Sequence, residues 1–323
     1  MSHDTTAAIH AEGLRKRFGD TQALDGVDLS ARAGTVLGVL GPNGAGKTTA
    51  VRILATLLKP DSGHATVGGY DVVRQPHQVR QTVGLTGQYA SVDEDLTGTQ
   101  NLVMIGRLLG LSAPNARTRA AELLAWFDLN DAAARVAKTY SGGMRRRLDL
   151  AASLVGRPAV IFLDEPTTGL DPAKREEMWD VVRSLVSDGS TVLLTTQYLD
   201  EADALADEIS VIDHGRVIAH DTPDGLKRVV GGQRIEVRPS DPARLPEIRA
   251  ILGDITGAAP EVVGRERLSV AVADERYFAP VVARLAADDI GVHELSLHLP
   301  SLDEVFLTLT GRTTDQTTEE TAA

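Results

Sequence analysis

One nine-residue stretch limits what this chain can fold into more than any other part of it: Gly41, Pro42, Asn43, Gly44, Ala45, Gly46, Lys47, Thr48 and Thr49. The stretch matches the pattern G-x-x-x-x-G-K-[ST], and it lies between an apolar run at 35–40 and a helical run. Its glycines let backbone N–H groups turn inward, and the following helix adds a positive dipole end to the same cavity. We therefore expect a loop that binds a triphosphate, with Lys47 on the β- and γ-phosphates and Thr48 on magnesium.

A second polar site is predicted where another apolar run ends. Residues 160–163 are apolar, and two adjacent carboxylates, Asp164 and Glu165, follow them. Ligands of open α/β sheets collect at the carboxyl edge of the strands, which is where this pair would lie. In this interpretation Asp164 orients magnesium through its water shell, and Glu165 polarises the water that attacks the γ-phosphorus. The alternative is an exposed acidic turn without a chemical role.

A third motif points to a second subunit. Ser141, Gly142 and Gly143 precede a helical run, so they present a hydroxyl and bare backbone amides at a helix N-terminus. Such a terminus is an anion site. One triphosphate does not need two separate helix N-termini from one subunit, so we expect this site to face the nucleotide of another copy. The alternative is a plain helix cap, because serine is a preferred N-cap residue.

Composition excludes several classes of partner. Of the 323 residues 42% are hydrophobic, which is enough for one large domain and a small one. The formal net charge of -12 argues against nucleic acid as the main partner, and the absence of cysteine excludes disulfides and thiolate metal sites. The sequence has no secretory signal, and its apolar runs are too short to span a bilayer. We therefore expect a cytoplasmic chain whose membrane role depends on a partner.

The pattern of apolar runs predicts two domains. From 7 to 230, short β-branched runs alternate with helical stretches, as in a mainly parallel α/β sheet wrapped by helices, with a helical insert at about 93–150. A smaller α+β domain follows at 231–311, and residues 312–323 are typical of a disordered tail. The strands predicted in the first domain are 35–40, 160–163, 191–195 and 209–213. The second domain is predicted to have strands at 235–237, 268–272 and 292–299 and helices at 243–252, 277–286 and 302–309.

These motifs resemble the ATP-binding-cassette (ABC) family across about residues 7 to 220, in the order that this family shows. The family's signature usually reads LSGGQ, and residues 140–144 here read YSGGM. The resemblance implies a P-loop NTPase core with ATP and Mg²⁺ as cofactors. It also implies three further site residues: Phe18 matches the aromatic that stacks on adenine, Gln88 the glutamine that contacts magnesium, and Asp171 the loop through which two subunits communicate. For Asp171 the alternative is an ordinary Asp-Pro turn.

One position departs from the family pattern. Where the family normally has a histidine after the strand at 191–196, this chain has Gln197. A glutamine amide donates a hydrogen bond to a γ-phosphate oxygen, but it carries no titratable proton. We therefore predict that Gln197 positions the phosphate without transferring a proton, and that it completes a catalytic set with Glu165 and Lys47.

Four segments are similar to a narrower group, the ATPase subunits of anthracycline-resistance exporters of the daunorubicin/doxorubicin type: TTQYLDEAD, GQYASVDEDLTG, TYSGGMRRRLDLAASL and LPSLDEVFLTLTG. This resemblance implies a peripheral protein on the cytoplasmic face of the cell membrane that drives a separate transmembrane permease subunit. It implies a head-to-tail homodimer that closes over two ATP molecules, and a drug or antibiotic as the exported cargo.

Three alternatives stay open. A soluble ABC protein of translation or DNA repair would carry tandem cassettes or long coiled-coil inserts, and the sequence has neither. A regulatory module would hold ATP and scarcely hydrolyse it because of Gln197. A transporter of a lipid, a polysaccharide or a peptide would share every motif above, because nothing in the chain is expected to contact cargo.

Overall fold

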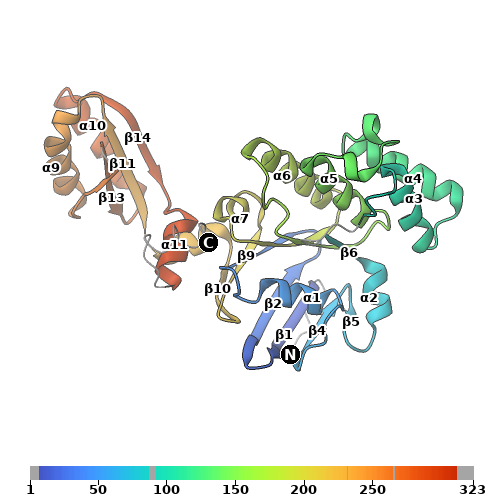
Figure 1. Ribbon diagram of the computed structural model, residues 1–323. Coiled ribbons are helices and arrows are strands. Elements are labelled where there is room, and N and C mark those ends of the chain that lie inside the picture. The colour runs from blue at the N-terminus through green and yellow to red at the C-terminus, as the bar shows by residue number, and fades with distance from the viewer. Residues whose placement is uncertain (1–6, 87–91, 231, 265, 311–323) are drawn as a thin grey trace. The chain divides into compact units, whose positions relative to one another are not determined.

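The computed structural model describes residues 7–86, 92–230, 232–264 and 266–310 (Figure 1). The chain divides into two units, of which the first ends at Thr222 and the second begins at Pro223. Helix α8 (Pro223–Val230) therefore belongs to the second unit, and the boundary predicted at 230/231 lies at the end of this helix. None of the helices in these residues is long and apolar enough to cross a membrane.

The first unit contains two sheets. The larger one has the order β10-β9-β3-β8-β7-β6, and its neighbouring strands are parallel except for the edge pair β10 and β9. Its strands are β3 (Val36–Leu40), β6 (Val83–Thr86), β7 (Val160–Asp164), β8 (Thr191–Thr196), β9 (Glu208–Asp213) and β10 (Arg216–Asp221). The smaller sheet is antiparallel, in the order β2-β1-β4-β5, with β1 (Ala7–Phe18), β2 (Thr21–Arg32), β4 (Ser62–Val67) and β5 (Tyr70–Asp71).

The described residues of the first unit also form helices. They are α1 (Lys47–Leu54), α2 (Pro76–Thr82), α3 (Gly98–Leu108), α4 (Ala113–Trp126), α5 (Gly142–Ser153), α6 (Pro172–Ser187) and α7 (Leu199–Leu205), with 3₁₀ turns at Asn130–Ala132 and Ala137–Thr139. The helical insert predicted at about 93–150 corresponds to α3, α4 and most of α5. Helix α3 begins at a capping box in which Thr97 and Gln100 satisfy each other's backbone N–H groups.

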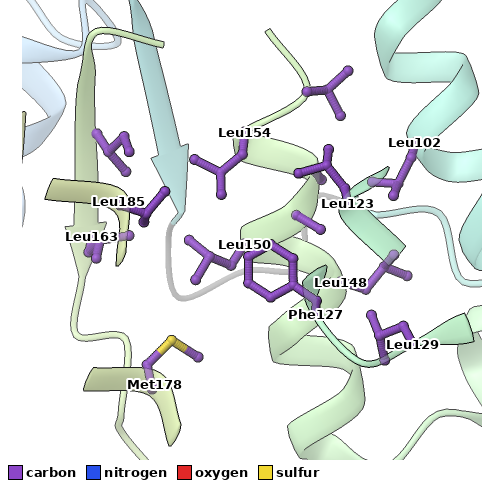
Figure 2. Packing of buried hydrophobic residues seen from close by; sticks show 14 of the residues in the cluster. Leu102, Leu123, Phe127, Leu129, Leu148, Leu150, Leu154, Leu163, Met178 and Leu185 are labelled. Atoms are coloured by element: carbon purple, nitrogen blue, oxygen red, sulfur yellow. The ribbon is translucent and has the colours of Figure 1, made fainter. Parts of the chain in front are cut away.

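The central strands β3, β7 and β8 are buried along their whole length. Alternate side chains of β7 enter different cores, because successive residues of a strand point to opposite faces. Val160 and Phe162 pack with α1 and the antiparallel sheet. Ile161 and Leu163 pack with α3 to α6, where Figure 2 shows Leu163 and the large side chains of that cluster. Burial on both faces explains why these strands read as continuous apolar runs in the sequence.

The second unit is a four-stranded antiparallel sheet in the order β12-β13-β11-β14. Its elements are β11 (Gln233–Pro239), α9 (Leu245–Thr256), β12 (Glu261–Val263), β13 (Arg267–Val272), α10 (Phe278–Ala287), β14 (Val292–His298) and α11 (Leu302–Thr310), with 3₁₀ turns at Pro242–Arg244 and Glu275–Tyr277. Helices α9 and α10 share one apolar core with the sheet. The chain order βαββαβ and this strand order are those of a ferredoxin-like fold.

Candidate active site

The phosphate loop runs from the end of β3 to the start of α1, and it is tightly held by its neighbours. A Cβ atom at Gly41 would lie 2.2 Å from the carbonyl oxygen of Ile212, and one at Gly46 would lie 2.5 Å from that of Ala23. Gly46 also has a φ of 110°, which side-chain-bearing residues rarely adopt. Glycine is therefore required at these two positions to let the backbone wrap closely.

Lys47 is buried at the centre of this loop. Its Nζ donates hydrogen bonds to the carbonyl oxygens of Gly41 (2.7 Å) and Pro42 (3.2 Å), and it lies 3.5 Å from Glu165 Oε1. Burial lowers the pKa of Lys47, and the carboxylates of Glu165 and Asp164 oppose that shift. The phosphate loop and the acidic strand end, which are more than a hundred residues apart in the sequence, thus meet at one ammonium group.

Asp164 connects the same two motifs a second time. It is the last residue of β7, and its Oδ1 accepts hydrogen bonds from Thr195 Oγ1 (2.6 Å) and Thr48 Oγ1 (3.2 Å). Thr195 lies on β8 and is the cross-strand partner of Asp164. Thr48 therefore lies beside the carboxylate with which it was predicted to share magnesium. Thr195 was not predicted, since only the register of β7 and β8 reveals it.

Glu165 adopts a backbone conformation that is rare for its residue type. Its φ is 51°, and its N–H is directed at both the carbonyl and the hydroxyl oxygen of Thr195 (3.1 Å each). Its Oε2 accepts a weak hydrogen bond from Thr168 Oγ1 (3.4 Å). Strained conformations of this kind cost about 1–3 kcal/mol and cluster at functional sites. The turn fixes the direction of the Glu165 side chain toward Lys47.

Arg146 also holds this acidic turn, and no sequence pattern indicated that role. The guanidinium comes from α5 and donates to three successive carbonyl oxygens, those of Asp164 (3.4 Å), Glu165 (3.1 Å) and Pro166 (3.0 Å). Burial lowers the pKa of Arg146, and neighbouring carboxylates oppose the shift. The helix that follows the signature residues is therefore tied to the backbone that carries Glu165.

The signature residues lie at the start of α5, which Figure 1 shows apart from α1. The Ser141 hydroxyl accepts from the backbone N–H three residues further on (3.2 Å), so it caps its own helix, and Ser141 and Gly142 are exposed. A Cβ at Gly143 would come within 3.1 Å of the Lys174 side chain. Lys174 in turn pairs with Asp171, which caps α6 and whose pKa is lowered by that pair. Within one chain, the signature therefore contacts the Asp171 loop.

The other predicted site residues are placed by the topology of the sheet. Gln197 directly follows β8 and is half-buried. Because β8 lies between β3 and β7, Gln197 follows the strand that lies between the one that leads to the phosphate loop and the one that leads to Glu165. Phe18 ends β1 with 49% of its surface exposed, and Lys16 Nζ lies 5.7 Å from its ring centre. Gln88 lies outside the described residues. It follows β6, which ends at the same edge of the sheet.

The donor set is suited to magnesium. Mg²⁺ prefers oxygen ligands and is usually bound by one or two carboxylates together with phosphates and water. Thr48 Oγ1 and Asp164 Oδ1 supply two such oxygens, 3.2 Å apart, next to the loop whose backbone is built for phosphates. The residues present therefore fit the ion that the motifs predict.

Relatives of this chain establish its family. The ABC transporter family model matches residues 24–168. The daunorubicin resistance ATP-binding protein DrrA2 of Streptomyces coeruleorubidus is 57% identical over 318 residues, which are 98% of this chain and 99% of that protein. The Nod factor export ATP-binding protein I of Ralstonia nicotianae is 40% identical over 314 residues, 95% of each chain.

Solved structures agree with this assignment. The structure of an ATP binding subunit of an ABC transporter is 25% identical with a TM-score of 0.63, and the match covers 69% of this chain and 92% of that one. This match confirms the predicted cassette core. Given the identity to its relatives over nearly its whole length, the chain belongs to the ABC transporter family as an ATP-binding, ATP-hydrolysing subunit.

Proposed function

We propose that this chain hydrolyses ATP in a head-to-tail homodimer and thereby drives export of an anthracycline-like drug through a separate transmembrane permease. In this proposal it acts as a peripheral protein on the cytoplasmic face of the membrane. The observation that carries the chemical part is the meeting of Thr48 with Asp164 and of Lys47 with Glu165, which joins a phosphate loop to an acidic strand end.

Each residue of this meeting point has a role in the proposal. Lys47 exchanges its contacts with loop carbonyls for the β- and γ-phosphates, and Thr48 and Asp164 hold Mg²⁺, directly and through water. Bound Mg²⁺ supplies charge neutralisation at the phosphates. Glu165 orients and polarises the attacking water, and Gln197 donates its amide N–H to a γ-phosphate oxygen. Phe18 stacks on adenine, and Gln88 contacts the metal.

The second half of each site comes from another copy. Ser141 and Gly142 are exposed at a helix N-terminus, and this terminus lies apart from α1 of the same chain. Backbone N–H groups at such a terminus bind anions, so Ser141 to Gly143 would contact the γ-phosphate held by a second subunit. Asp171 pairs with Lys174, which lies beside the signature residues Ser141 to Gly143, so a change at one nucleotide site would be transmitted to the other through Asp171.

The proposed cargo is inferred from the names of the relatives. The relative at 57% identity is named for daunorubicin resistance, which favours an anthracycline-like drug. The relative at 40% identity is named for export of Nod factor, so a cargo other than a drug, such as a lipid or a polysaccharide, stays the second candidate. ATPase activity of the chain in membranes that contain its permease separates the two. Stimulation by daunorubicin supports the first, and stimulation by a lipo-oligosaccharide alone supports the second.

Glu165→Gln tests the chemical part of the proposal. The substitution removes the base and keeps the shape of the side chain, so hydrolysis should fall by about 10²–10⁴-fold while ATP binding persists. Glu176→Gln is the matched control, since Glu176 is exposed on α6. Equal hydrolysis by both variants would show that Glu165 is not the base. Size-exclusion chromatography with ATP should show Glu165→Gln as a dimer, and a monomer would contradict the proposed assembly.

A further inference from the structure

Glu201 is a buried carboxylate that none of the roles above uses. It lies in the first turn of α7, four residues after Gln197, and it is 0% exposed. Neither of its carboxylate oxygens has a hydrogen-bond partner among the described residues. Burying a carboxylate without hydrogen bonds is unfavourable, so a group in this state requires an explanation.

Two donors in the same position lack acceptors. Thr167 Oγ1 and Trp179 Nε1 are both buried, and within the described part of the chain neither has a hydrogen-bond partner. The side chains of Thr196, Thr167 and Trp179 face the Glu201 carboxylate and act to lower its pKa, whereas burial, the largest effect, raises it. One acceptor and two matching donors are therefore gathered at one buried place, close enough for the donors to lower the pKa of Glu201 but outside ordinary hydrogen-bond geometry.

The charged groups around Glu201 have other partners. Arg175 attracts the carboxylate, but its NH1 donates to Asp200 Oδ2 (2.9 Å) and its guanidinium lies 4.6 Å from the centre of the Tyr198 ring. Arg146 interacts electrostatically with Glu201, but its guanidinium donates hydrogen bonds to the carbonyls of residues 164–166. Thr196 Oγ1 makes a weak hydrogen bond to the Tyr198 carbonyl (3.5 Å). Thr167 Oγ1 and Trp179 Nε1 are thus the uncharged donors that remain for the Glu201 oxygens, beside Arg175 Nε, which also has no hydrogen-bond partner among the described residues.

These groups belong to the segments that carry the proposed chemistry. Thr167 lies in the loop between Glu165 and Asp171, and Trp179 lies on α6, which Asp171 caps. Glu201 lies on α7, directly after the segment that carries Gln197. A small movement that joins Glu201 to both donors would fix the position of Glu165 relative to Gln197.

We propose that Glu201 is a positioning residue for hydrolysis: when nucleotide is bound, its carboxylate accepts hydrogen bonds from Thr167 and Trp179 and so holds the Glu165 loop against the end of β8. This inference rests on the proposed roles of Glu165 and Gln197. The inference adds a side-chain clamp between the Glu165 loop and the segment that follows β8. Without this clamp, only main-chain contacts would fix the position of one relative to the other.

Single-donor substitutions in the full chain test the clamp. Trp179→Phe removes the indole N–H and keeps a smaller aromatic ring, and Thr167→Val removes the hydroxyl and keeps the shape. Each should lower kcat for Mg-ATP by about tenfold, because a misplaced catalytic group slows the reaction, and leave the ATP Kd within about twofold. Thr167→Ser keeps the hydroxyl and should restore kcat. Trp126→Phe, at the other of the two tryptophans, is the control and should leave kcat unchanged.

The carboxylate itself is tested by a pair of variants. Glu201→Gln keeps one carbonyl acceptor and should retain more of kcat than Glu201→Met, which keeps none. If Glu201→Met does not fold, Thr167→Val and Trp179→Phe decide the question. Wild-type kcat in both donor variants would overturn the clamp, as would a loss in Thr167→Val that Thr167→Ser fails to restore. Hydrolysis at the wild-type rate by Glu165→Gln would instead overturn the proposed function, so the two failures are distinguishable.

Discussion

The parallel sheet of the first unit and the antiparallel sheet of the second place their polar side chains in different ways. In the first unit, β3, β7 and β8 end at one edge, and the residues that follow them, Lys47, Glu165 and Gln197, come from three distant parts of the sequence. In the second unit the charged residues lie along the strands. Arg267 on β13 pairs with Glu236 on β11 (3.2 Å) and with Glu294 on β14 (3.1 Å).

The difference follows from strand direction. Neighbouring parallel strands bring their carboxyl ends together, so short motifs far apart in the sequence meet in one site. Neighbouring antiparallel strands end at opposite edges, and charged side chains on one face of the sheet pair with each other across the strands. We therefore expect substitutions at the edge of the first sheet to affect function strongly and those on the second sheet to have small effects on stability.

The largest effect should come from a single methyl group at Gly41. Gly41→Ala places a Cβ 2.2 Å from the carbonyl oxygen of Ile212, so the loop must shift by roughly 1 Å, and affinity for Mg-ATP should fall by about a hundredfold or more. Titration with a fluorescent ATP analogue measures this. Gly142→Ala is the control for stability, since nothing lies within 4 Å of its Cβ, and its Tm should be unchanged or raised. Wild-type affinity in Gly41→Ala would contradict the structure of the loop.

Arg146 tests whether the acidic turn depends on α5. Arg146→Met removes hydrogen bonds to three carbonyls and should lower the free energy of unfolding by roughly 1.5–3 kcal/mol, with a loss of hydrolysis. Arg145→Met is the matched control. Arg145 pairs with Glu94 at the surface, so its loss should cost no more than about 1 kcal/mol. Denaturant unfolding of the two variants gives the comparison, and equal losses would show that Arg146 has no special role in holding the turn.

Glu201 should make stability depend on pH. A carboxyl whose pKa is raised by folding stabilises the protein below its unfolded pKa, near 4.5, and this contribution is lost as the pH rises through the raised pKa. Glutamine does not titrate, so the Tm of the wild type should fall relative to Glu201→Gln as the pH rises above the unfolded pKa and through the raised pKa of the folded protein. Thermal melts across this range measure the difference. A difference independent of pH would show that the Glu201 carboxyl does not change its protonation on folding.

The smallest effect is expected on the second sheet. Arg267→Gln removes two ion pairs of partly exposed side chains and should change the free energy of unfolding by less than about 1 kcal/mol. Because Arg267 lies outside the cassette unit, affinity for ATP should not change. Chemical denaturation and the same nucleotide titration as for Gly41→Ala provide the test. A loss of ATP affinity in Arg267→Gln would break the contrast between the two sheets.

Much of the fold was predictable where one physical pattern dominates. The strands β3, β7, β8 and β9 were predicted within one residue at each end, because burial on both faces makes them apolar throughout. Helices α9, α10 and α11 and the three longer strands of the second unit were also predicted, since their apolar residues follow regular spacing. The antiparallel sheet of the first unit was not predicted. In β1 buried residues such as Ile9 and Leu14 are mixed with glycine and charged residues, and bulges interrupt the alternation.

The loops that carry the proposed chemistry can be identified from local sequence patterns. Glycine spacing before Lys47, two carboxylates after an apolar strand and a serine before two glycines are local patterns, and each one specifies its own turn or helix start. The contacts that support these turns, in contrast, are visible in the folded protein and not in the sequence. Thr195 reaches Asp164 through strand register, Arg146 reaches three carbonyls from another helix, and Glu201 is buried beside Thr167 and Trp179. Such contacts depend on packing between distant segments, and no local sequence pattern records them.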